Sequence, residues 1–197
     1  MSITAITKRT IRPLLTIVLL GIYSASCTSA AERKRENSPN VAKLDSVKTV
    51  VSEALNVIEN FPKEEIMLQS VKVDDLQTFF TETEYRFTRE QYLGEIDKVV
   101  SAQRAFNKVF EALPSLRDEA NLAYDQLASL KKAYVQKQIT DEEFTEYLER
   151  EMEAAQIFMF NYHKRVTRAL EFNEALDTIF PQAEALRAQA IQNSTTP

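Results

Sequence analysis

The sequence predicts an all-α fold, a bundle of four to five helices built on a long antiparallel helical hairpin, and three observations support this. Apolar residues recur at intervals of three and four over most of the chain from Val41 onward, which is the period of an amphipathic helix. Only two glycines occur in 197 residues, so few of the tight turns of a sheet protein are available. Signals that end one helix and start another meet at residues 138–140, between two arms of nearly equal length.

The hairpin turn lies in K-Q-I-T-D-E-E-F, residues 137–144. Thr140 and Glu143 have the spacing of a capping box, and Ile139 and Phe144 have the spacing of a hydrophobic staple. The stretch resembles the short helix-turn-helix modules that read G-x-I-T-x-E-E-F, and the resemblance implies a hairpin and no activity. The arms, about 88–137 and 141–190, would each span roughly 75 Å if straight.

Charge and periodicity predict how the arms pack. We expect the lysines at 131, 132 and 137 to lie opposite the acid-rich run 141–153. The segment 157–160, I-F-M-F, is apolar all round a helix and therefore predicts contacts on several sides. Helices within 41–86 are expected to supply those contacts.

The remaining boundaries follow from prolines and caps. Phe61-Pro62 predicts a break after a helix that begins near Val41, and a second helix is expected over 66–80. Residues 81–88 read as an extended connector, ended by a capping box of Thr88 and Gln91. Pro114 allows a kink or a tight corner, and the shortage of residues for a reversal favours the kink. The heptad of the last arm holds to Pro181, and a disordered tail is expected over 191–197.

The N-terminus has the layout of a secretory signal peptide over residues 1–26. Lys8, Arg9 and Arg12 precede the apolar run 14–23, which is too short for a comfortable transmembrane helix. The run is followed by S-A-S-C, which ends in Cys27, the only cysteine in the chain.

This set resembles the lipobox of bacterial lipoproteins. The resemblance implies that Cys27 receives a diacylglycerol thioether, that the signal is removed, and that the protein is anchored to a membrane of the bacterial cell envelope, facing the periplasm or the outside. Ordinary signal-peptidase cleavage, a mitochondrial presequence and an uncleaved anchor are the alternatives. Residues 27–40, polar and without apolar periodicity, then predict a flexible tether that holds a bundle domain over 41–190.

The composition and the missing motifs argue against catalysis. Three of the 24 basic residues precede Cys27, which leaves 21 against 29 acidic residues, a net charge of −8 that disfavours nucleic acid as a partner. A single histidine, His163, cannot build a di-iron or zinc site within one chain, and no G-x-S-x-G, phosphate loop or H-E-x-x-H occurs. We therefore expect no catalytic residues, no metal and no cofactor. The polar seam residues Gln103 and Asn173 read as register-setting.

These observations predict a lipid-anchored envelope protein that acts by protein–protein interaction or by self-association as a homo-oligomer. The alternative is a carrier that holds an apolar ligand in the bundle core. Four aromatic residues motivate a ligand groove, although helical spacing makes them more typical of core: Phe158, Phe160, Tyr162 and Phe172.

Overall fold

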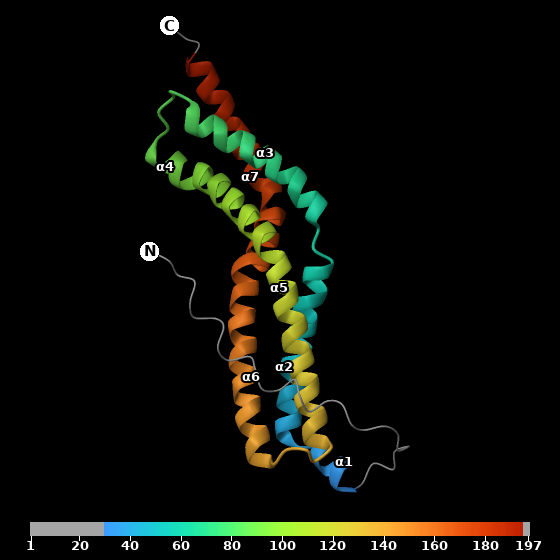
Figure 1. Cartoon of the computed structure of the whole chain (residues 1–197). Helices are drawn as coiled ribbons and strands as arrows, with labels where there is room; N and C mark the ends of the chain where they lie inside the picture. The colour runs from blue at the N-terminus through green and yellow to red at the C-terminus, as the bar shows by residue number, and fades with distance from the viewer. Residues whose placement is uncertain (1–29, 195–197) are drawn as a thin grey trace, which may run out of the picture.

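The computed structural model describes residues 30–194, and within that range it contains helices and no strands (Figure 1). The predicted all-α fold is confirmed. The elements are α1 (Ala30–Glu36), α2 (Pro39–Glu59), α3 (Lys63–Glu82), α4 (Arg89–Gln91), the π-helical segment η2 (Tyr92–Ile96), α5 (Asp97–Val135), α6 (Asp141–Tyr162), the π-helical segment η3 (His163–Thr167) and α7 (Arg168–Ser194).

The helices form a long, narrow bundle with three legs (Figure 1). One leg is α2 followed by α3, the second runs back from α4 through η2 and α5, and the third returns from α6 through η3 to α7. The second and third legs are the predicted hairpin. Helix α5 packs against α2 and α6 in one half of the bundle and against α3 and α7 in the other. It is therefore the common partner of the other long helices.

The hairpin turn has the predicted capping. The hydroxyl of Thr140 accepts a hydrogen bond from the Glu143 amide, and the Glu143 carboxylate accepts one from the Thr140 amide at 2.8 Å. Phe144 is fully buried and stacks on Tyr134 with ring centroids 3.9 Å apart. Ile139 packs against the core, as the staple predicts. The two arms are thus joined by a capped helix start and by a buried ring pair.

Helix α5 ends in a Schellman motif. The amides of Lys137 and Gln138 donate to the carbonyls of Tyr134 and Ala133, at 3.0 and 2.9 Å. Lys137 has a φ of 59°, the left-handed conformation in which glycine is usual. This explains how the turn closes although no glycine stands there.

Side-chain contacts fix the register of the first leg against α5. Lys131 pairs with Asp45 at 2.7 Å, and Gln103 donates to Asp74 at 3.1 Å. The two pairs have residue numbers that total 176 and 177. In an antiparallel pair of helices, residues at the same height have numbers with a nearly constant sum. Pro114 therefore lies level with the break after α2, Asn60–Pro62.

Contacts between the second and third legs place η3 at the same height as Pro114. Tyr134 stacks on Phe144, and Gln91 donates to Gln189 at 3.3 Å. These totals are 278 and 280, which place η3 opposite Pro114. The break after α2, Pro114 within α5 and the π-helical segment η3 therefore lie at one height. Figure 1 shows the upper half of the bundle tilted relative to the lower half at this level.

The helices end or continue differently at Pro62, Pro114 and Pro181. Helix α2 ends before Pro62 as predicted, and α3 covers the helix expected over 66–80. Helix α5 continues through Pro114, so the predicted kink is confirmed and the alternative, a tight corner, is excluded. Helix α7 also continues through Pro181, because Ile179 and Ala183 on either side are buried and hold the helix in place.

Helix extends further at both ends of the bundle than the sequence predicts. The flexible tether expected over 27–40 is helical from Ala30 to Glu36, and α2 already begins at Pro39. Ser38 caps α2, and Pro39 occupies its first turn, where a proline suits a helix. The disordered tail expected from 191 is helical to Ser194, next to the buried Ala190. The expected signal peptide and Cys27 lie outside the described residues.

The register places the lysines at 131, 132 and 137 level with the acid-rich run 141–153, but the ion pairs at this end of the bundle involve other partners. Lys131 pairs with Asp45 of α2 instead of with the run 141–153, and Asp141 pairs with Arg35 at 3.1 Å. The sequence analysis considered each arm of the hairpin only as a partner for the other arm. The first leg and α1 also pack beside the hairpin and offer closer partners.

Two substitutions rank the contributions at the turn. Thr140→Ala should lower the free energy of unfolding by about 1 kcal/mol, and Thr140→Asp should restore most of it because an aspartate also caps. Phe144→Ala should cost more, about 4 kcal/mol, because it leaves a cavity beside Tyr134. Chemical denaturation gives each value. An equal cost for the two alanine variants would contradict the buried position of Phe144.

Candidate interaction surfaces

His163, the one residue considered as a metal ligand, lies on the surface of the bundle. His163 is exposed, its Nδ1 lies 3.1 Å from the Thr167 hydroxyl, and its ring meets the edge of Tyr162. Over residues 30–194, no three histidine, cysteine or acidic side chains are grouped in a way that would hold a metal ion. In the same range no helix is both long and apolar enough to cross a membrane.

The register-setting residues tie the legs together. Gln103 is buried, and besides its bond to Asp74 it lies 3.4 Å from the Ser70 hydroxyl. Asn173 donates to the Glu65 carboxylate at 2.7 Å. Both amides thus connect α3 to the other two legs. Their contacts are therefore structural.

Two inward groups have shifted pKa values, and burial is the main cause in both. Burial raises the pKa of the Glu151 carboxyl, and it raises the pKa of the Tyr162 phenol against a smaller opposing effect of a hydrogen bond with Thr167. Because folding raises the pKa of Glu151, this group lowers stability as the pH rises above its ordinary value of 4.5. The shifts therefore reflect packing.

The four aromatic candidates do not line one groove. Phe158 and Tyr162 are buried in the core, and Phe172 is partly buried against it. Phe160 points outward and is 64% exposed. The expectation that 157–160 makes contacts on several sides is therefore wrong, because no helix within residues 30–194 covers the outer side of α6.

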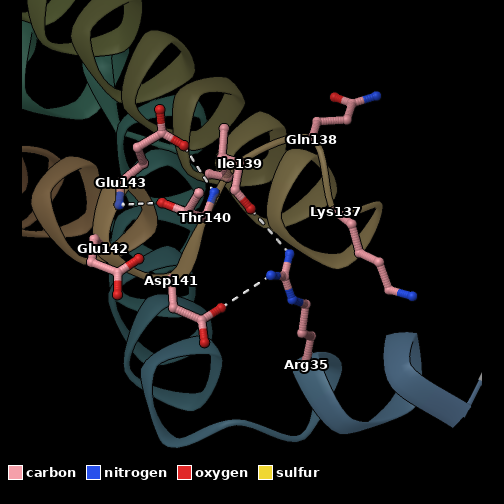
Figure 2. A pocket seen from close by; sticks show the side chains of 8 residues that line it. All are labelled: Arg35, Lys137, Gln138, Ile139, Thr140, Asp141, Glu142 and Glu143. Carbon is pink, nitrogen blue, oxygen red and sulfur yellow. Dashed lines mark hydrogen bonds and ion pairs between the residues drawn. The ribbon is translucent and has the colours of Figure 1, made fainter.

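A pocket of about 380 Å³ lies at the hairpin turn, beside α1 (Figure 2). Arg35 reaches across it from α1 and donates to the carbonyls of Tyr134 and Ile139 at 2.9 and 3.0 Å. Its guanidinium also pairs with Asp141 and lies over the Tyr134 ring, 4.7 Å from the centroid. These contacts of Arg35 fasten α1 to the hairpin.

A second, shallow depression of about 200 Å³ lies between α2 and α6. Its lining is mostly apolar and includes two polar side chains: Ser46, Val47, Val50, Val51, Met152, Ala155, Gln156 and Met159. Sequence reasoning missed this groove, because it depends on which sides of α2 and α6 face each other.

Exposed apolar side chains gather on two further faces. On α3 the outward group is Met67, Leu68 and Val71, which are 51%, 70% and 69% exposed. On α6 it is Ile157 and Phe160, at 58% and 64%. On each helix the spacing of three and four places these side chains on one side. Such groups are typical of surfaces that contact another macromolecule.

The fold and its surfaces define a class of protein, an elongated all-α bundle with outward apolar faces. Comparisons of the chain with protein-family models, with curated proteins and with solved structures found no match. The function therefore has to be argued from the residues and their arrangement.

The role of Arg35 has a direct test. Arg35→Ala removes two hydrogen bonds from a charged donor and should cost about 2 kcal/mol. Amide hydrogen exchange should show faster exchange over α1 with little change in α6. Arg33→Ala, an exposed neighbour, is the matched control. If both variants leave the exchange of α1 unchanged, Arg35 does not fasten it.

Proposed function

We propose that this protein is a lipid-anchored component of the bacterial cell envelope that works by binding other proteins along an elongated helical bundle. The single observation that supports binding most strongly is the outward apolar group Met67, Leu68 and Val71 on α3. Leaving these side chains in water forgoes the free energy of burying them, which a partner protein would recover.

The anchor completes the proposal. Cys27 precedes Ala30 by three residues, so an acylated Cys27 would lie within about 11 Å of the start of α1. Arg35 fastens α1 to the hairpin turn, so the membrane attachment would be at that end of the bundle. The bundle is roughly 80 Å long over the 54 residues from 141 to 194. Its far end would then reach partners well away from the anchor.

The anchor is tested by Cys27→Ser. The variant should take up no labelled fatty acid and should move from the membrane to the soluble envelope fraction. A wild-type protein that takes up no label, with a variant that stays on the membrane, would contradict the lipoprotein proposal.

The binding surface is tested by a double variant, Leu68→Asp with Val71→Asp. Both positions are exposed, so the fold should persist, while a partner that buries them should bind at least about tenfold more weakly. Co-purification from membranes, with mass spectrometry of the bound proteins, measures the loss. Gln182→Asp on α7 is the exposed control. If the double variant and the control recover the same proteins in the same amounts, the α3 face is not the binding surface.

The second candidate function is a carrier, and the aliphatic groove between α2 and α6 favours it. An apolar chain would lie against Val50 and Met159 in such a groove. Native mass spectrometry and solvent extraction of the purified protein distinguish the two functions. A bound lipid released by Met159→Glu would favour the carrier, and a protein free of ligand would count against it.

A further inference from the structure

The outward side of α6 carries a second heptad, separate from the one that packs into the bundle. Its members recur at intervals of three and four on the side opposite the buried Leu148 and Ala155. In order they are Glu146, Glu149, Arg150, Glu153, Ile157 and Phe160 on α6, and Lys164 in the adjoining η3. All of them are exposed, and together they are called the α6 outer face below.

The chemistry of the α6 outer face changes along the helix. Its N-terminal part is mainly acidic, with Glu149 and Glu153 beyond the Arg150–Glu146 ion pair. Its centre is apolar, with Ile157 and Phe160 more than half exposed. Its C-terminal part is basic, and Lys164 lies over the Phe160 ring with Nζ 5.6 Å from the centroid. Beyond η3 the next exposed base is Arg168.

This order is complementary to itself when reversed. In a helix that runs antiparallel to α6 with the same sequence, Lys164 comes opposite Glu153 and Arg168 comes opposite Glu149. A parallel copy would place Glu153 against Glu153 and Lys164 against Lys164. Charge complementarity of this kind selects the orientation of a pair of helices.

We propose that the α6 outer face binds the same face of a second copy of this chain, in an antiparallel, two-fold symmetric pair. The axis passes between residues 158 and 159. Ile157 then packs on Phe160 of the second copy, and Glu153 lies opposite Lys164 of the second copy. Each contact occurs twice because a two-fold interface is isologous. Figure 1 shows that the outer side of α6 lies at the edge of the bundle, away from α5 and α2.

We expect the pair to be weak, because only one helix from each copy supplies the contact. A standard stable interface is larger and buries about 1,600 Å². Anchoring to a membrane raises the local concentration of the chain, which favours a weak pair. The inference rests on the proposed function, since it adds a copy of the chain to the proteins bound. It uses α6, whereas the binding surface proposed above is on α3, so failure of either leaves the other intact.

A charge swap tests the pair. The full chain and its variants are compared by sedimentation equilibrium in density-matched detergent, over a hundredfold range of concentration. Glu153→Lys and Lys164→Glu each replace two opposite-charge contacts by like-charge contacts, and each should weaken dimerisation roughly tenfold. The double variant, Glu153→Lys with Lys164→Glu, should restore it. Glu119→Lys, an exposed acid on α5, is the control and should have no effect.

Phe160→Ser keeps the charges and removes the apolar centre, so it should also weaken the dimer. Circular dichroism should be the same for all variants, because every changed residue is exposed. A wild-type chain that is monomeric over the whole range overturns the proposal. Single charge variants that weaken the dimer without rescue in the double variant also overturn it, because the pairing of Glu153 with Lys164 would then be incorrect.

Discussion

The packing of both halves of the bundle on one uninterrupted helix, α5, is the constraint on which the rest of the structure depends. Helices α2 and α3 are separated by a break at Asn60–Pro62, and α6 and α7 by the π-helical segment η3, yet all four pack on α5. Had α5 reversed at Pro114, only the third leg, 141–194, would run through both halves. The proline costs one backbone hydrogen bond and favours a bend. Because the other legs are interrupted at the same height, the bundle bends as a unit and keeps its core on both sides (Figure 1).

Much of the fold is predictable because local chemistry decides it. Thr140 and Thr88 both form the capping boxes that their spacing with Glu143 and Gln91 predicts, since these bonds involve residues three positions apart. The buried apolar seams follow from helical periodicity for the same reason. The break at Phe61-Pro62 and the bend at Pro114 follow from the missing amide of proline and its fixed φ.

Features that depend on where helices meet are not predictable in this way. Arg35 reads as part of a polar linker, and only the proximity of the hairpin turn gives its guanidinium two carbonyls and a carboxylate to bind. The exposure of Ile157 and Phe160 depends on the number of legs beside α6, which periodicity alone leaves open. The α2–α6 groove and the π-helical segments carry no sequence signal of their own.

The proposals on function fit together geometrically. In the antiparallel pair, the axis lies about 18 residues from the start of α6, so the two hairpin ends would be roughly 50 Å apart. An anchor at each of these ends would reach one membrane if the pair lies along its surface. The α3 face is in the other half of the bundle from the start of α6 and would stay open to other proteins.

The most direct test of the structure is the distance across Pro114 within α5. Spin labels on cysteines at the exposed positions Lys98 and Asp125, in a chain with Cys27→Ser, are separated by 27 residues of helix. Pulsed electron paramagnetic resonance should give about 40 Å if α5 is continuous with a modest bend. A distance near 20 Å would mean that the chain reverses at Pro114, which would contradict the three-legged bundle and the shared role of α5.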